Sequence, residues 1–184
     1  MTELQSMIEG CQKGQAQWQK ALYDKFNASI YALCLRYSSG SAQAQDLLVE
    51  GFTIAFNKIA DYRGEGSFEG WLRSIFLRLA IRQFKDKQLT CSNDIEQLSE
   101  VSGQDSVWQS PSVDLDLRID LKEAMRIVLA QLPDQQRLIF NLKAVEGYSL
   151  SEIADQTGST ESSVKYHYYE ALEVVRKKMK GFLE

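Results

Sequence analysis

Proline is nearly absent from this chain, and that scarcity constrains its fold more than any other feature. Only Pro111 and Pro133 occur among 184 residues. Because proline breaks the interior of a helix, two prolines favour long uninterrupted helices over a loop-rich all-β fold. The apolar fraction of 44% is enough to bury a core and argues against wholesale disorder. The length allows one domain, or two of roughly 70–90 residues each.

Composition and periodicity divide the chain into three segments. Residues 1–87 and 114–184 are rich in helix-forming residues with clear apolar periodicity. Residues 88–113 are rich in Ser, Asn, Asp, Gln and Gly, and they contain one of the two prolines. The sequence therefore predicts an all-α protein, with two small helical domains joined by a linker.

Three helices are predicted in the first segment. Apolar residues from Leu22 to Tyr37 recur at steps of three or four, which is the stripe of an amphipathic helix. A second helix is expected over 42–59 and a third over 68–87. Residues 63–67 contain two glycines, which predict a loop between the second and third helices.

A basic row lies along the third predicted helix, where Arg78, Arg82 and Lys85 stand at i, i+4 and i+7. Such a row is most often the solvated edge of a core helix. Three aromatic residues stand at the start of the same helix: Tyr62, Phe68 and Trp71. Aromatic rings beside a basic groove are what single-stranded nucleic acid requires, through base stacking and phosphate attraction.

The third segment shows the spacing of a helix-turn-helix. Ile153 and Ala154 precede Gly158, and Val164 follows it. The small residue lets two helices approach, the glycine permits a left-handed turn, and the β-branched residue packs back on the first helix. Residues 149–152 fit a capping box at the start of the first helix of this pair. A compact helical cluster without a ligand can show the same spacing.

Polar and aromatic side chains occupy the outward face of the last predicted helix: Ser162, Ser163, Lys165, Tyr166, His167 and Tyr169. Such a helix can enter a DNA major groove with its first turns. Basic residues crowd its C-terminal turns, where they can hold phosphates. They would also stabilise the end of their own helix without any DNA.

The acidity of the chain does not exclude nucleic acid. The net charge is −4, but residues 88–120 carry seven acidic residues and one basic residue. The rest of the chain is therefore slightly positive. We expect weak DNA binding by the isolated protein.

Catalytic, metal and cofactor sites are not expected. The single histidine removes most metal sites and most His-based acid–base chemistry. No nucleophile–base pair, phosphate-binding glycine loop or carboxylate dyad is present, and the three cysteines form no Cys-x-x-Cys pair. No secretory signal or membrane span is recognised, which predicts a reduced, cytoplasmic protein without membrane insertion.

Three sequence runs stand in a fixed order along the chain. The most diagnostic is Tyr-Arg-Gly-Glu-Gly-Ser-Phe-Glu-Gly-Trp-Leu, residues 62–72. Leu-Pro-x-x-Gln-Arg at 132–137 opens the second domain, and Glu-Gly-Tyr-Ser-Leu-Ser-Glu-Ile-Ala follows at 146–154. Taken in order, these motifs resemble those of bacterial RNA polymerase sigma factors of the extracytoplasmic-function (ECF) type, and the resemblance covers nearly the whole chain.

The resemblance implies a division of labour between the two domains. Residues 1–87 correspond to sigma region 2, 88–113 to an acidic linker and 114–184 to sigma region 4. Region 2 would dock on the β′ clamp helices of core RNA polymerase through Asp46, Leu47, Glu50 and Phe52. It would melt and hold the −10 element through Tyr62, Arg63, Ser67, Phe68, Trp71, Arg78, Arg82 and Lys85. No cofactor is implied.

Region 4 would contact the β flap with its first helices and the −35 element with its last helix. The −35 residues implied are Ser162, Ser163, Lys165, Tyr166, His167, Tyr169 and Glu170. Factors of this type are commonly held inactive by an anti-sigma factor, which is a further expected partner.

Departures from the family pattern fall at contact positions. Val49 stands where a glutamine is usual, which implies a more apolar polymerase contact. Arg78 and Arg82 stand where Asn and Asp are usual, which strengthens phosphate attraction. On the last helix Glu170 replaces an arginine.

Three other functions are alternatives for such a sequence. A stand-alone helix-turn-helix regulator would bind duplex DNA without polymerase, but it leaves the run at 62–72 without a purpose. A helical adaptor or anti-factor would bind only protein and makes the helix-turn-helix spacing a coincidence. An enzyme would need a catalytic group that the sequence does not offer.

The acidic side chain on the last helix gives the first prediction. Arginine reads guanine, whereas Glu170 can accept from the N4 amino group of cytosine. We expect Glu170→Ala to relax the preference at one −35 position by about 1 kcal/mol. A gel-shift series over all −35 base substitutions measures this, and an unchanged preference at every position would refute it.

Overall fold

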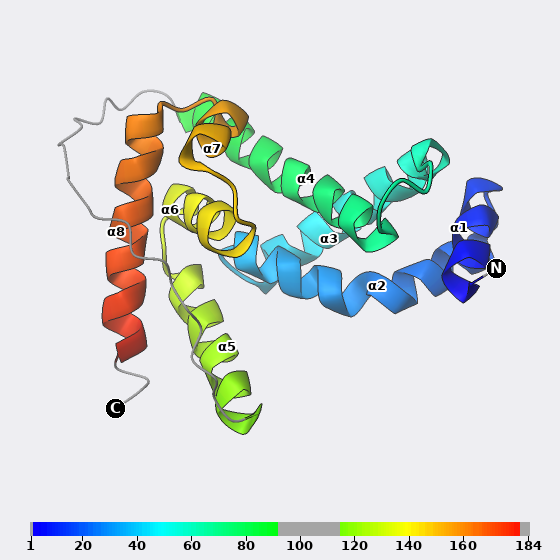
Figure 1. Ribbon diagram of the computed structural model, residues 1–184, viewed down its shortest axis with the longest axis horizontal. Coiled ribbons are helices and arrows are strands. Elements are labelled where there is room, and N and C mark those ends of the chain that lie inside the picture. The colour runs from blue at the N-terminus through cyan, green and yellow to red at the C-terminus, as the bar shows by residue number, and fades with distance from the viewer. Residues whose placement is uncertain (1, 92–114, 181–184) are drawn as a thin grey trace. The chain divides into compact units, whose positions relative to one another are not determined.

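The computed structural model describes residues 2–91 and 115–180 (Figure 1). Every regular element in these ranges is a helix, as the sequence predicts. The chain divides into two compact units, Met1–Arg82 (unit 1) and Gln83–Glu184 (unit 2). The last helix that begins in unit 1 continues to Cys91, and residues 92–113 of the predicted linker lie outside the described residues. The predicted domain boundaries stay predictions.

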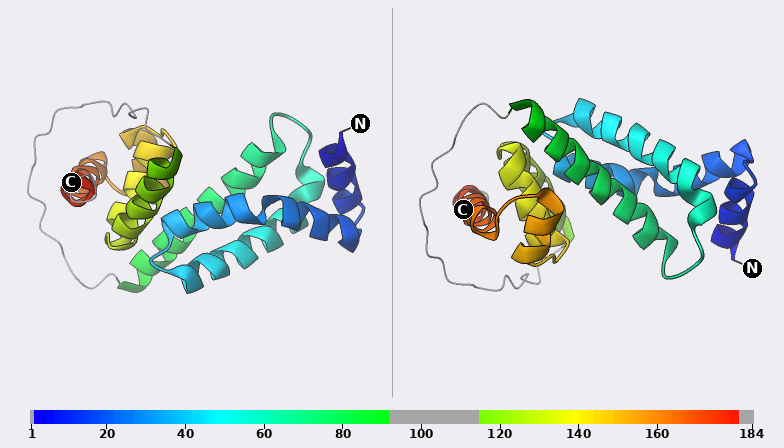
Figure 2. Two further views of the ribbon diagram at one scale, coloured as in Figure 1. Left: turned by 90° about the horizontal axis from the view of Figure 1, so that it is seen from below. Right: turned by 90° about the horizontal axis from the view of Figure 1, so that it is seen from above.

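Unit 1 consists of α1 (Glu3–Gln12), α2 (Ala16–Tyr37), α3 (Ser41–Lys58), the short 3-10 helix η1 (Ile59–Asp61) and the start of α4 (Phe68–Cys91). Helices α2, α3 and α4 lie side by side (Figures 1 and 2), and apolar periodicity predicts all three. Helix α1, which packs on α2, is not predicted from the sequence because it is short and contains a glycine.

Helices α3 and α4 approach each other closely at Gly51. A Cβ atom added there would lie 2.1 Å from Cε1 of Phe76, which is 0% exposed. The ring of Phe76 therefore occupies space that only glycine leaves open. It also meets the Phe52 ring edge-on at 5.4 Å between centroids, and Phe52 in turn lies 4.8 Å from Tyr23 of α2. These rings tie the three helices into one core.

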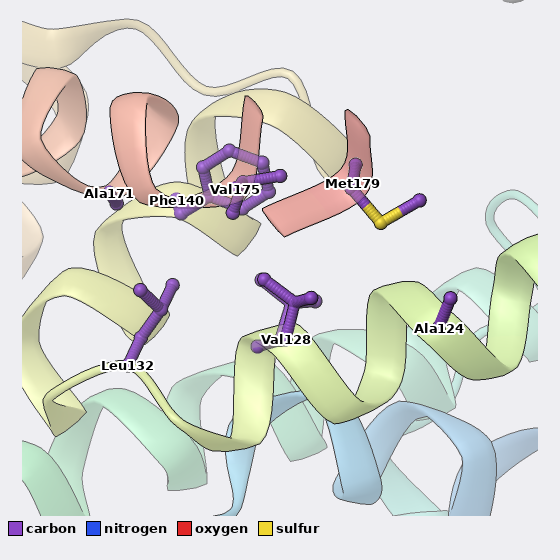
Figure 3. Close-up of a cluster of buried hydrophobic side chains, with 8 residues drawn as sticks. Ala124, Val128, Leu132, Phe140, Ala171, Val175 and Met179 are labelled. Carbon is purple, nitrogen blue, oxygen red and sulfur yellow. The ribbon is translucent and has the colours of Figure 1, made fainter. Parts of the chain in front are cut away.

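Unit 2 contains α5 (Leu115–Ala130), α6 (Asp134–Phe140), the π-helical segment η2 (Asn141–Val145), α7 (Leu150–Thr157) and α8 (Glu161–Lys180). Its core lies between α5, α6 and α8 (Figure 3). The buried members are Ala124, Val128, Leu129, Leu132, Phe140, Ala171, Val175 and Met179. On α8, Val164, Ala171, Val175 and Met179 are buried, whereas Tyr168 and Leu172 are partly buried.

A buried arginine closes the turn between α5 and α6. Arg137 is 1% exposed, and its guanidinium donates to the carbonyl oxygens of Leu132 at 2.9 Å and Ala130 at 3.3 Å. It also pairs with Asp134. Burial lowers the pKa of Arg137, and the nearby carboxylate opposes that effect. The arginine thus provides donors for carbonyl groups that the end of α5 leaves without helical partners.

Cys34 of α2 lies in the core of unit 1. The residue is 0% exposed, and burial raises the pKa of its thiol to about 12. The reactive thiolate is therefore scarce at neutral pH.

Within residues 2–91 and 115–180, no helix has the combination of length and apolarity that crossing a bilayer requires.

The contact at Gly51 predicts the effect of a single added methyl group. Gly51→Ala should gain up to about 1 kcal/mol of helix propensity but lose more through the clash with Phe76. We expect a net destabilisation of about 1–2 kcal/mol in urea unfolding followed by circular dichroism. The exposed Ala42→Val on the same helix is the control and should cost at most about 0.7 kcal/mol. An unfolding midpoint for Gly51→Ala at or above wild type would contradict this account.

Candidate nucleic-acid and polymerase interfaces

The loop between η1 and α4 is shaped by two glycines. Gly64 and Gly66 have φ values of 79° and 80°, the left-handed region in which side chains are strained. The Tyr62 hydroxyl donates to the Gly66 carbonyl at 3.0 Å, which closes the loop on itself. At its far end, Ser67 Oγ accepts from the N–H of Gly70 at 3.1 Å. Ser67 therefore acts on the start of α4 as a helix cap does.

Three aromatic rings gather at this loop. Centroid separations are 5.2 Å for Tyr62–Phe68, 5.4 Å for Tyr62–Trp71 and 5.3 Å for Phe68–Trp71. Phe68 is only 3% exposed and also contacts Phe26 of α2, whereas Tyr62 and Trp71 are half-buried. The structure thus brings together the three aromatics singled out in the sequence. Phe68 thus lies on the buried side of the cluster, and part of the Tyr62 and Trp71 side chains is accessible to solvent.

A groove of about 320 Å³ runs along α3 and α4 in unit 1, called the α3–α4 groove below. Its lining residues are Ile54, Lys58, Asp61, Trp71, Ile75, Arg78, Leu79 and Arg82. Cationic groups, an aromatic ring and apolar stems therefore share one concave surface, which is the chemistry of a single-stranded nucleic-acid groove. Arg63 on the loop is exposed and Lys85 of α4 is half-buried; neither lines the groove.

Five lining residues are not among the site residues predicted from the sequence: Ile75 and Leu79 of α4, and Ile54, Lys58 and Asp61. The last three lie at the end of α3 and in η1, and no motif marks them. The helical period places Ile54 and Lys58 on one face of α3 because they are four residues apart. This spacing can be read from the sequence, but it does not reveal that the face of α3 with Ile54 and Lys58 adjoins α4.

Glu50 and Arg82 form an ion pair with each other. The resemblance assigns Glu50 to polymerase and Arg82 to DNA, and the structure joins the two on adjacent helices. Their side chains are 41% and 56% exposed, so water screens the pair and its contribution to stability is small, about 0–1 kcal/mol. The charge of Arg82 is nevertheless partly neutralised in the free protein.

The predicted polymerase-binding residues lie on two different faces of α3. Asp46 is exposed and Glu50 is half-buried, whereas Leu47 and Phe52 are 2% and 3% exposed. Leu47 and Phe52 therefore hold α3 against its neighbours and do not present side chains to a partner. The face shared by Asp46 and Glu50 also carries Val49, which is 64% exposed.

In unit 2, α7 and α8 are joined by the predicted turn. Gly158 has φ 73° and ends α7 in the left-handed conformation. Ile153 of α7 and Val164 of α8 are both 0% exposed. Thr160 Oγ1 accepts from the N–H of Ser163 at 3.2 Å and caps α8. The helix-turn-helix geometry read from the sequence is confirmed.

The start of α7 carries the predicted capping box. Ser149 Oγ accepts from the N–H of Glu152 at 3.1 Å, and the Glu152 carboxylate accepts from the N–H of Ser149 at 2.8 Å. The donated backbone N–H lowers the pKa of Glu152, and the hydroxyl of Ser149 acts in the same direction. The carboxylate also faces the positive end of the α7 dipole.

The first turns of α8 present a mixed surface. Ser162 and Lys165 are exposed, and the other residues predicted for −35 DNA are partly buried: Ser163, Tyr166, His167, Tyr169 and Glu170. The Tyr166 and His167 rings lie 5.2 Å apart, edge to face. A pair of touching rings is stiffer than two separate side chains, so less entropy is lost when it docks on a groove.

Comparison with known families matches both units. Residues 22–90 match the family described as Sigma-70 region 2, and residues 122–174 match Sigma-70, region 4. The matched segments contain the loop with its aromatic cluster, the α3–α4 groove and the helix-turn-helix.

Two relatives are similar along most of the chain. The ECF RNA polymerase sigma factor SigX of Bacillus subtilis is 30% identical over 160 residues, which cover 86% of this chain and 81% of SigX. The RNA polymerase sigma-H factor of Pseudomonas aeruginosa is 25% identical over 189 residues, which cover 97% of this chain and 95% of the relative.

Among solved structures, the sigma factor RpoE in complex with the anti-sigma factor NepR from Bartonella quintana is 21% identical. The match has a TM-score of 0.46 and covers 88% of this chain and 96% of RpoE.

The capping box predicts a pH-dependent stability. The folded-state pKa of Glu152 lies below its ordinary value of 4.5, so its contribution is complete above that value and is lost as the pH falls further. Glu152→Gln, which cannot ionise, should therefore be less stable than wild type at pH 7, and the difference should shrink below pH 4.5. Urea unfolding at a series of pH values measures this. A difference that is constant with pH would contradict the assignment.

Proposed function

The chain belongs to the ECF family of RNA polymerase sigma factors, and we propose that it reads promoters through the α3–α4 groove and through α8. As a sigma factor it directs core RNA polymerase to promoters and initiates transcription. Sigma factors are initiation factors rather than catalysts, and we propose that this chain likewise has no catalytic role.

The α3–α4 groove is proposed as the site for the non-template strand of the −10 element. The observation that carries this proposal is the joint lining by Trp71, Lys58 and Arg78. An unpaired base can stack on the accessible face of Trp71, and the cations can attract the phosphates on either side. Extruding a base from duplex DNA costs a few kcal/mol, and these contacts offset that cost.

Asp61 is the only acidic residue that lines this groove among the described residues. A carboxylate in an otherwise basic groove repels phosphate but accepts hydrogen bonds from exocyclic amino groups. We therefore place Asp61 beside a base rather than beside the strand backbone.

The first turns of α8 are proposed to read the −35 element. The support is the helix-turn-helix geometry together with the exposure of Ser162 and Lys165. The Lys165 ammonium can bind a phosphate or a guanine, and the Ser162 hydroxyl can contact either a phosphate or a base edge. The side chains that are partly buried are expected to contribute through their accessible edges.

The exposed face of α3 is proposed as the docking surface for the β′ clamp helices. Asp46, Val49 and Glu50 share this face, which combines two carboxylates with a 64% exposed apolar side chain. Such a mixture is typical of an interface with an apolar centre and a polar rim. Contact of unit 2 with the β flap is part of the same proposal.

Two further features are proposed from family membership. The protein acts in the cytoplasm, where bacterial core polymerase works, and an anti-sigma factor controls its access to polymerase. Affinity purification of the tagged full chain tests the partners directly, because polymerase subunits and an anti-sigma factor differ in size and in peptide composition.

In vitro transcription tests the function and separates it from a stand-alone helix-turn-helix regulator. Core polymerase from the source organism is given fragmented genomic DNA with or without the full chain, and the 5′ ends of transcripts are mapped. Transcripts that start at specific sites only with the chain support the proposal. Duplex binding without polymerase, combined with no initiation, would favour the regulator.

Removing one groove charge gives the sharpest test of the −10 assignment. Arg78→Ala should weaken binding of the holoenzyme to single-stranded −10 DNA and reduce the salt slope by about one phosphate contact. Lys25→Ala is the matched control, because it removes an exposed positive charge from α2, which does not line the groove. Binding measured by fluorescence anisotropy at several salt concentrations distinguishes the two. Equal effects of both substitutions would refute the groove assignment.

A further inference from the structure

Helix α1 has no assigned role, because the match to Sigma-70 region 2 begins at residue 22. It packs closely within unit 1. A Cβ atom added at Gly10 would lie 2.0 Å from Cδ1 of Trp18, so α1 and the start of α2 are in close contact. Met7, Ile8 and Cys11 are buried. A ten-residue helix is marginal by itself, and this packing holds it in place.

The last residue of α1 reaches across to the segment that precedes the aromatic loop. Gln12 Nε2 donates to the carbonyl oxygen of Ile59 at 3.1 Å and to that of Tyr62 at 3.2 Å. The two acceptors are 47 and 50 residues away in the sequence. One amide group thus holds both ends of η1.

These two carbonyls lie where the chain leaves α3 and enters the loop. A helix end leaves carbonyl groups without helical partners, and Gln12 donates to the carbonyl of Tyr62 and adds a second donor at that of Ile59. The N–H of Tyr62 also donates to the Ile59 carbonyl at 3.2 Å. Tyr62 is therefore held at its N–H by Ile59, at its carbonyl by Gln12 and at its hydroxyl by Gly66.

We propose that Gln12 is a positioning residue for promoter opening: it holds the Tyr62 backbone so that the loop and Trp71 receive the unpaired −10 strand. The inference rests on the proposed function of the α3–α4 groove. Gln12 itself touches no DNA in this account. Its effect passes through Tyr62, whose ring contacts both Phe68 and Trp71.

The physical reason is preorganisation. Capture of an extruded base has to offset the cost of unstacking it, and a loop that must first be ordered adds to that cost. An amide suits this position because it is neutral and its NH2 group can donate to two acceptors. A glutamate of the same size would instead direct carboxylate oxygens at carbonyl oxygens.

The experiment compares two substitutions with a charge-matched control. Gln12→Met keeps the length and removes the donor, and Gln12→Glu adds repulsion. Gln5→Glu places the same new charge at an exposed position of α1. Each full-length variant is combined with core polymerase at a promoter mapped as described above. Opening is followed by permanganate reactivity of −10 thymines on duplex DNA and by initiation on a template whose −10 strands are mismatched.

We expect Gln12→Met to slow opening of the duplex promoter by about threefold or more, from the usual net value of a lost hydrogen bond, and Gln12→Glu to slow it further. Initiation on the mismatched template should fall less than opening of the duplex promoter, because its strands are already apart and no base has to be unstacked from a duplex there. Gln5→Glu should match wild type on both templates.

Several results would overturn the inference. Gln12 does not position the loop if Gln12→Met opens the promoter at the wild-type rate or if the loss is equal on both templates. The same conclusion follows if both Gln12 variants unfold at the assay temperature. Circular dichroism melting identifies the last case. If wild-type protein initiates at no promoter, the proposed function itself fails, so the two failures are distinguishable.

Discussion

The contact between the ring of Phe76 and the bare backbone of Gly51 sets the separation of α3 and α4, and the proposed sites of unit 1 depend on it. Because the ring fills the space where a side chain would otherwise stand, the two helices come close enough for Glu50 and Arg82 to pair. The same approach leaves the α3–α4 groove along the two helices. One face of α3 is thereby committed to the core, and another is available for a partner.

Some residues of the family motifs are exposed and can contact a partner, whereas others are buried and hold the helices in place. Leu47, Phe52 and Phe68 are buried, although the resemblance assigns them to polymerase and DNA. Their burial explains why such positions belong to a motif at all. Because a helix has a period of 3.6 residues, its apolar side chains lie on one face and its polar side chains on another. Burial of the apolar face fixes the orientation in which the exposed face meets DNA or polymerase.

Much of the fold was predictable from local signals. Proline scarcity and apolar periodicity predicted α2, α3 and α4, and the spacing around Gly158 predicted α7 and α8. Two features were not predictable. Helix α1 is held by packing against Trp18 and α2, which lies outside its own sequence. The π-helical segment η2 continues a helix with a different hydrogen-bond pattern, and side-chain periodicity does not distinguish the two.

Local sequence patterns are enough to predict the helical class, the two-part organisation, the aromatic and basic residues beside the loop, and the helix-turn-helix. Each of these depends on residues that are close in the chain, for which periodicity, capping and turn chemistry are sufficient. Three contacts follow from helix packing alone: Lys58 and Asp61 line one groove with Trp71, Glu50 pairs with Arg82, and Gln12 donates to the carbonyl of Tyr62. These contacts bring together residues that are far apart in the sequence. Their geometry follows from how the helices pack, which no local pattern records.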